Sequence, residues 1–131
     1  TAMLHTWGQT LVRHVHLHCL VPGGALGVPD GDEVIPVANR YVATFARAGC
    51  PVIFSRDWHP ADHCSFNAQG GPWPEHCVKG TAGAELHPAL ELPPIFGVVQ
   101  KATTPEREAY SDFEGTQLDE VLPRPKARPE V

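Results

Sequence analysis

The chain has 131 residues, enough for one domain with a sizeable core. Apolar residues make up 42% of it and charged residues 19%, a composition typical of globular soluble proteins rather than disordered ones. The formal net charge of −5 disfavours nucleic acids and anionic membranes as partners. No apolar run approaches the ~20 residues of a membrane helix, and no secretory signal pattern opens the chain.

The chain contains four cysteines, Cys19, Cys50, Cys64 and Cys77. Their spacings match no disulfide scaffold, and no CxxC pair of the kind found in zinc ribbons is present. We therefore expect free thiols in a reducing compartment, and a cytoplasmic protein.

The first patterned stretch is His14–His18, where imidazole and apolar side chains alternate as in a strand with three histidines on one face. Such a face can bind a metal. For so short a pattern, however, a poorly specified strand or a disordered leader is the favoured interpretation. Breaker residues at 22–24 then form a glycine loop.

A helix is predicted next, because apolar residues recur at helical spacing over 34–45 and Gly49 provides a stop. The apolar run 50–54 is the following strand. Strand, glycine loop, helix and strand make one βαβ unit, which implies an α/β fold with a parallel sheet.

The second half of the chain has less regular structure. Residues 60–94 lack periodicity and are rich in Gly, Pro, His and Trp, which favours a functional loop. Residues 95–99 form a third strand that ends near Lys101, and 103–116 form a polar loop. Residues 118–122 begin a helix, and the proline-rich tail at 123–131 should be mobile.

Metal-ligand side chains follow the second of these strands. Asp57 and His59 are two residues apart, and at a strand end such residues point to the same side. His76, in the long loop, is a third ligand of suitable type. Aspartate and two histidines with open coordination positions indicate a catalytic rather than a structural metal site. Asp57, His59 and Lys101 all fall just after strands, where sites of open parallel sheets form.

Seven motifs occur in a fixed order over residues 22–122: Pro22–Leu26, Gly31–Pro36, Arg56–Pro60, His63–Phe66, Trp73–Thr81, Gly83–Pro88 and Lys101–Thr116. Together they resemble the nicotinamidases, which belong to the isochorismatase-like cysteine hydrolases. The resemblance implies a three-layer, Rossmann-like α/β fold, here truncated after the third strand. It also implies hydrolysis of nicotinamide to nicotinate and ammonia in NAD salvage, with this small molecule as the partner.

By motif position, the resemblance implies roles for six residues. Asp57, His59 and His76 would bind a divalent metal, most often zinc, and Lys101 would be the catalytic lysine. Trp58 and Tyr110 would lie near the pyridine ring, whose nitrogen the metal would hold.

Nearby residues have weaker claims to such roles. His63 is expected beside the ligands rather than among them, and His87 is expected to be structural. Catalysis by the thiol of Cys77, next to His76, is disfavoured.

Two departures from the family bear on activity. The family's catalytic triad is Asp, Lys and Cys, yet positions 14 and 15, where the Asp would fall, are His and Val. Residues 1–21 therefore form a divergent leader before a partial hydrolase domain at 22–122. The family's nucleophilic Cys lies in a segment beyond residue 131. We expect a weakly active or inactive chain.

Two alternative functions stay open. One is a non-catalytic remnant that binds a metal or a partner subunit. Another is a relative that hydrolyses a different aromatic amide, such as pyrazinamide. A homo-oligomer is also compatible with the sequence.

Overall fold

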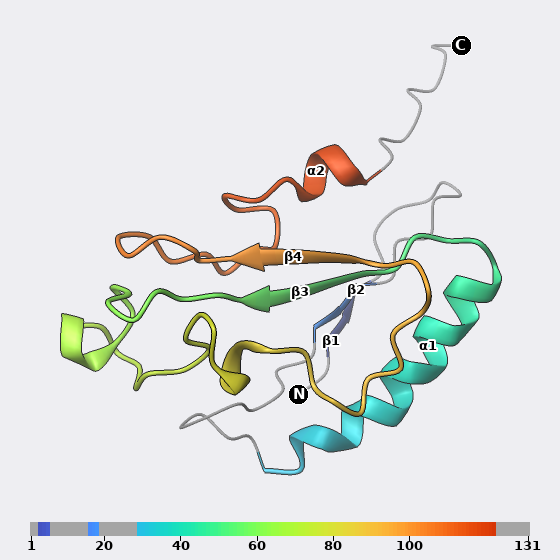
Figure 1. Ribbon diagram of the computed structural model, residues 1–131, viewed down its shortest axis with the longest axis horizontal. Coiled ribbons are helices and arrows are strands. Elements are labelled where there is room, and N and C mark those ends of the chain that lie inside the picture. The colour runs from blue at the N-terminus through green and yellow to red at the C-terminus, as the bar shows by residue number, and fades with distance from the viewer. Residues whose placement is uncertain (1–2, 6–15, 19–28, 123–131) are drawn as a thin grey trace.

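The computed structural model describes residues 3–5, 16–18 and 29–122 (Figure 1). The 22–24 loop, the 123–131 tail and most of the leader therefore lie outside the described residues, as do His14 and Cys19.

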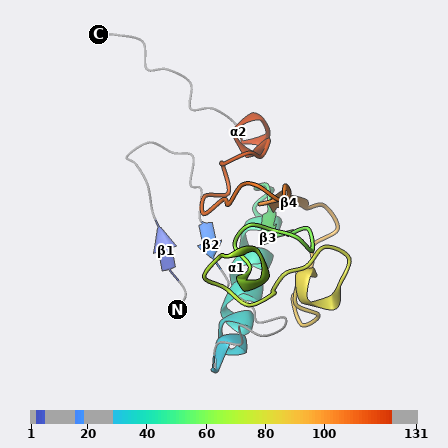
Figure 2. The ribbon, with the colours of Figure 1, turned by 90° about the vertical axis from the view of Figure 1, so that its left-hand side faces the viewer.

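The described part of the alternating stretch is a strand, β2 (His16–His18), which pairs antiparallel with β1 (Met3–His5). These two strands form a sheet of their own, separate from the parallel sheet (Figure 2). The expectation that this stretch opens the βαβ unit is therefore wrong for 16–18. Short alternation indicates an extended backbone but carries no information about its pairing partner.

The helix forms where its apolar periodicity predicts, as α1 (Ile35–Arg47), after a short 3-10 turn, η1 (Gly31–Val34). Pro36 lies in the first turn of α1, where a backbone N–H would have no acceptor within the helix. The N–H group that proline lacks is therefore not missed there. Gly49 follows the helix with φ of 69°, the left-handed conformation that ends helices and that glycine adopts without strain.

The two remaining strands, β3 (Ile53–Asp57) and β4 (Gly97–Lys101), pair in parallel, with Asp57 opposite Lys101. The α/β class with a parallel sheet is thus confirmed. Both strands begin and end later than predicted, so Asp57 and Lys101 close the strands instead of following them. Backbone pairing defines a strand, and it continues through polar residues that the apolar runs left out.

Residues 58–96 form a long irregular connection with two 3-10 turns, η2 (Asn67–Gln69) and η3 (Ala82–Ala84). In Figure 1 much of this connection gathers at the arrowhead end of β3 and β4. The last helix, α2 (Leu118–Val121), lies where one was expected. Among the described residues, no helix is long and apolar enough to cross a membrane.

The core is centred on the loops rather than on the sheet. The largest fully buried side chains are Phe66, His59 and His63. Burying two imidazoles costs free energy unless each ring nitrogen finds a hydrogen-bond partner or a metal.

Candidate metal centre

The carboxyl ends of β3 and β4 bring Asp57 and Lys101 together. The Lys101 Nζ donates to Asp57 Oδ1 at 2.5 Å and to the backbone oxygen of Ala109 at 3.0 Å. The side chains of Asp57 and Lys101 are only 22% and 15% exposed. Lys101 is therefore a partly buried cation that donates two hydrogen bonds. One of its acceptors, Asp57, is a predicted metal ligand.

His59 and His76 present the same nitrogen to the same kind of acceptor. The Nδ1 of His59 lies 3.3 Å from the oxygen of Ala102, and the Nδ1 of His76 lies 2.8 Å from the oxygen of Pro74. A carbonyl only accepts, so each Nδ1 carries the proton and each Nε2 keeps its lone pair. Across the described residues, neither Nε2 has a hydrogen-bond partner. The two rings are edge to face, with centroids 4.8 Å apart.

Backbone orientation of one nitrogen is how proteins aim the other nitrogen at a metal. The backbone around these rings is itself held in an unusual conformation. Cys77, after His76, has φ of 47°, and Ala102, whose oxygen binds His59, has φ of 51°. Left-handed φ in non-glycine residues costs about 1–3 kcal/mol and collects at functional sites.

His63 is bonded differently, through both ring nitrogens. Its Nε2 donates to the oxygen of Arg107 at 3.1 Å, and its Nδ1 accepts from Ser65 Oγ at 2.8 Å and from Ser65 N at 3.3 Å. Its ring lies against that of His59, with centroids 4.1 Å apart. His63 therefore has no spare lone pair, and it ties the 60–66 loop to the loop after β4.

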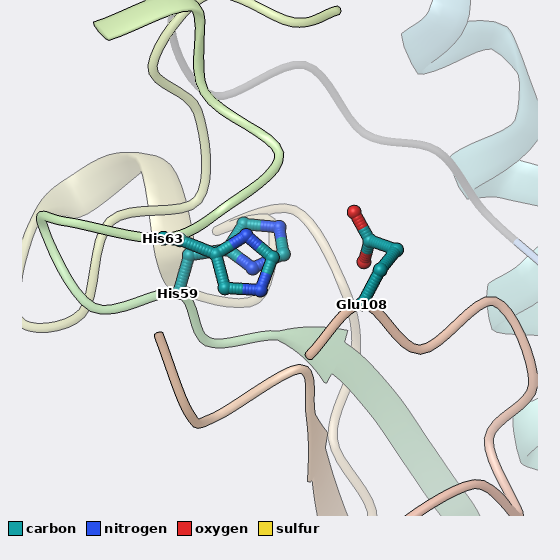
Figure 3. A group of neighbouring side chains, drawn as sticks. All are labelled: His59, His63 and Glu108. Atoms are coloured by element: carbon teal, nitrogen blue, oxygen red, sulfur yellow. The ribbon is translucent and has the colours of Figure 1, made fainter. Parts of the chain in front are cut away.

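A second set of possible ligands consists of His59, His63 and Glu108, whose ligand atoms all lie within 4.8 Å of one another (Figure 3). Asp57 and His76 belong to no group this compact within the described part of the chain. Glu108 was not expected from the sequence, because only folding returns its loop to the histidines. The backbone bond from Cys64 N to Pro105 O, at 2.7 Å, makes that return.

Two groups at the site have shifted pKa values. Burial lowers the pKa of His59, as do His63 and His76, while the charge of Asp57 raises it in part. This favours the neutral imidazole that a metal needs. Burial and the charge of Asp57 raise the pKa of Cys77, with Lys101 opposing. Cys77 is thus kept as a thiol, which is a poor nucleophile.

Of the two residues expected near the substrate ring, Trp58 contacts Arg56 and Tyr110 is exposed. Trp58 adjoins β3, where alternation places it with Arg56 on the face opposite Asp57 and His59. The Arg56 guanidinium carbon lies 3.9 Å from the centroid of the Trp58 ring, and Arg56 forms an ion pair with Glu85. Tyr110 is 77% exposed. Their roles toward a substrate stay predictions.

Comparisons with protein families, curated proteins and solved structures find relatives mainly of one kind. The model of the Isochorismatase domain matches residues 12–128. A nicotinamidase of Escherichia coli (strain K12) is 40% identical over 121 residues, which cover 76% of this chain and 57% of that protein. A crystal structure of the pyrazinamidase of Pyrococcus horikoshii in complex with zinc is 50% identical, with a TM-score of 0.72. That match covers 78% of this chain and 56% of the other.

One match is of another kind. A putative transposase of Sinorhizobium fredii is 62% identical over 34 residues, which are 26% of this chain and 8% of that protein. So short a match carries no implication of transposase activity. The chain spans about half the length of the curated nicotinamidases it matches.

Proposed function

The chain belongs to the isochorismatase family, and from this we propose that it carries the metal-binding part of a nicotinamidase-type hydrolase. The reaction is hydrolysis of nicotinamide to nicotinate and ammonia, in NAD salvage. The observation that carries the proposal is the pair of backbone-oriented imidazoles with free Nε2 atoms, beside a carboxylate at a strand end. The names of the nicotinamidase relatives support this substrate.

We propose Asp57, His59 and His76 as the ligands of a divalent metal, with zinc favoured. His59 and His76 offer unused lone pairs, whereas His63 would have to give up a buried hydrogen bond to bind a metal. Glu108 accepts a hydrogen bond from the N–H of Ala109 instead. A bound metal would supply positive charge that holds the pyridine nitrogen and withdraws electron density from the ring.

The remaining roles follow from the charge and position of the side chains. Lys101 is the catalytic lysine, a fixed ammonium that can hold a proton and stabilise negative charge near the reacting amide. Trp58 and Tyr110 flank the pyridine ring. Because its pKa is raised, Cys77 is not the nucleophile, and we assign none among the described residues.

A further proposal concerns the compartment of the protein. The described cysteines, Cys50, Cys64 and Cys77, are free thiols, which supports a reducing cytoplasm.

The alternative function is metal binding without turnover, and the unactivated thiol beside the metal ligands favours it. A related amide such as pyrazinamide is a second possible substrate, supported by the name of a structural relative.

The test combines zinc stoichiometry with ammonia release from nicotinamide by the purified chain. We expect one zinc per chain, lost in His76→Ala and kept in Glu108→Gln. The opposite pattern would select the set with His63 and Glu108. Ammonia release that is lost in Lys101→Ala would support the hydrolase, whereas bound zinc without ammonia release would support the alternative.

A further inference from the structure

We infer that Lys101 also sets the strength of metal binding, as a fixed positive charge on Asp57 that competes with the metal for that carboxylate. The inference rests on the proposed function, because it takes Asp57 as a metal ligand. Lys101 Nζ lies 2.5 Å from Asp57 Oδ1, so that oxygen already accepts a charge-assisted hydrogen bond. A metal bound to Asp57 would therefore share the negative charge of this carboxylate with the ammonium of Lys101.

Lys101 is held where it stands. Its second acceptor is the oxygen of Ala109, at 3.0 Å, which remains available when a metal binds. The ammonium would also lose hydrogen bonds if it moved within its mostly buried surroundings. The backbone of Lys101, at the end of β4, is also held in place. Asp57 and Lys101 are register partners, and Trp58 N donates to Lys101 O at 3.0 Å. Metal binding therefore brings a second positive charge next to one that is fixed.

The two arginines near this part of the chain, Arg56 and Arg107, form ion pairs with other carboxylates. Arg56 is on the opposite face of β3, paired with Glu85. Arg107 pairs with Glu114 and is 70% exposed at its side chain. Within the described residues, Lys101 is thus the cation bonded to a proposed ligand.

The sign of the effect follows from electrostatics. Like charges close together in a partly buried site repel, with less screening than at the surface. Removing the ammonium leaves the full negative charge of Asp57 to a metal. The Asp57 backbone keeps its pairing with β4 in a Lys101 variant, so the carboxylate stays at the same strand end. Repulsion therefore outweighs positioning, and the wild-type lysine weakens zinc binding.

The test measures the zinc dissociation constant of the metal-free 131-residue chain by competition with a chromophoric chelator. Lys101→Met removes the charge and keeps most of the apolar stem, and we expect it to bind zinc about tenfold more tightly. Lys101→Arg keeps the charge and should stay close to wild type. Lys79→Met removes an equal charge from an exposed residue near the site and should also leave the constant unchanged.

The possible outcomes distinguish failure of this inference from failure of the proposed metal site. Equal or weaker zinc binding by Lys101→Met, with wild-type circular dichroism, would overturn the inference and leave the metal site standing. If Lys101→Met fails to fold, Lys101→Gln removes the same charge while keeping a donor for Ala109, and the same criterion applies. Absence of zinc binding in every variant and in wild type would overturn the proposed metal site itself.

Discussion

At the scale of single residues, the protonation of His59 connects the site to the stability of the chain. The ring is buried, and its pKa is lowered below the ordinary value of 6.5. The unfolded chain therefore binds a proton at a higher pH than the folded chain does. Above pH 6.5 His59 is neutral in both states, and its protonation does not reduce the free energy of unfolding. As the pH falls from 6.5 through the pKa of the folded chain, protonation of the unfolded chain lowers that free energy.

We predict that the free energy of unfolding of the metal-free chain decreases between pH 7.5 and pH 5.5. For one proton, the slope cannot exceed about 1.4 kcal/mol per pH unit. His59→Gln removes the titrating group and should show a smaller decrease over the same interval, as measured by urea denaturation. Equal decreases in both proteins would mean that other groups control the pH dependence.

The residues of the site differ in how far the sequence predicts them. Asp57 and His59 were suggested by their spacing alone, because period two is a local property of strands. Glu108 and the satisfied state of His63 depend on a loop brought back from 44 residues away, at Arg107. Local patterns cannot report such a contact. The same holds for the Lys101–Asp57 pair, which requires the register between two strands.

At the scale of elements, the loop from Ser65 to Trp73 is held by an unusually close backbone approach. A Cβ on Gly71 would lie 2.2 Å from the carbonyl carbon of Ser65 and 2.4 Å from the oxygen of Cys64. Real side chains never come so close, so the backbone would have to move. The same loop contains Phe66, which packs against His59 and His76.

We predict that Gly71→Ala lowers the free energy of unfolding by about 2 kcal/mol or more and weakens zinc binding. Gly97→Ala is the matched control, since its Cβ would meet Ile53 at an ordinary 3.6 Å. It should change stability by less than about 0.5 kcal/mol. Urea denaturation of both variants checks the prediction, and similar losses in the two would contradict the steric explanation.

At the scale of the whole molecule, the order of helix and strands was predictable but the arrangement of sheets was not. The helix at 35–47 and the parallel pair follow from periodicity and apolar runs. The pairing of 16–18 with 3–5 does not, because any extended segment can pair with several others. The burial of the histidines at the core centre also depends on the complete fold.

The surface left by this arrangement predicts how the chain behaves in solution. Within the described residues, β4 pairs with β3 alone, so its other edge has no strand partner. Ile95, just before β4, is 89% exposed, and Phe96 and Val98 are exposed as well. An apolar patch beside an unpaired strand edge favours association between copies.

We therefore predict that the chain self-associates as its concentration rises, and that Ile95→Lys combined with Val98→Lys reduces association and dye binding to exposed apolar surface. Added charge by itself also improves solubility. The control therefore adds the same two positive charges away from β4, by Gln117→Lys and one more substitution of an exposed residue by lysine. Sedimentation velocity over a concentration series distinguishes the two effects. If the control reduces association as much as the β4 variant does, net charge governs it. If only the β4 variant does, the apolar patch at the strand edge is the surface through which the chains meet.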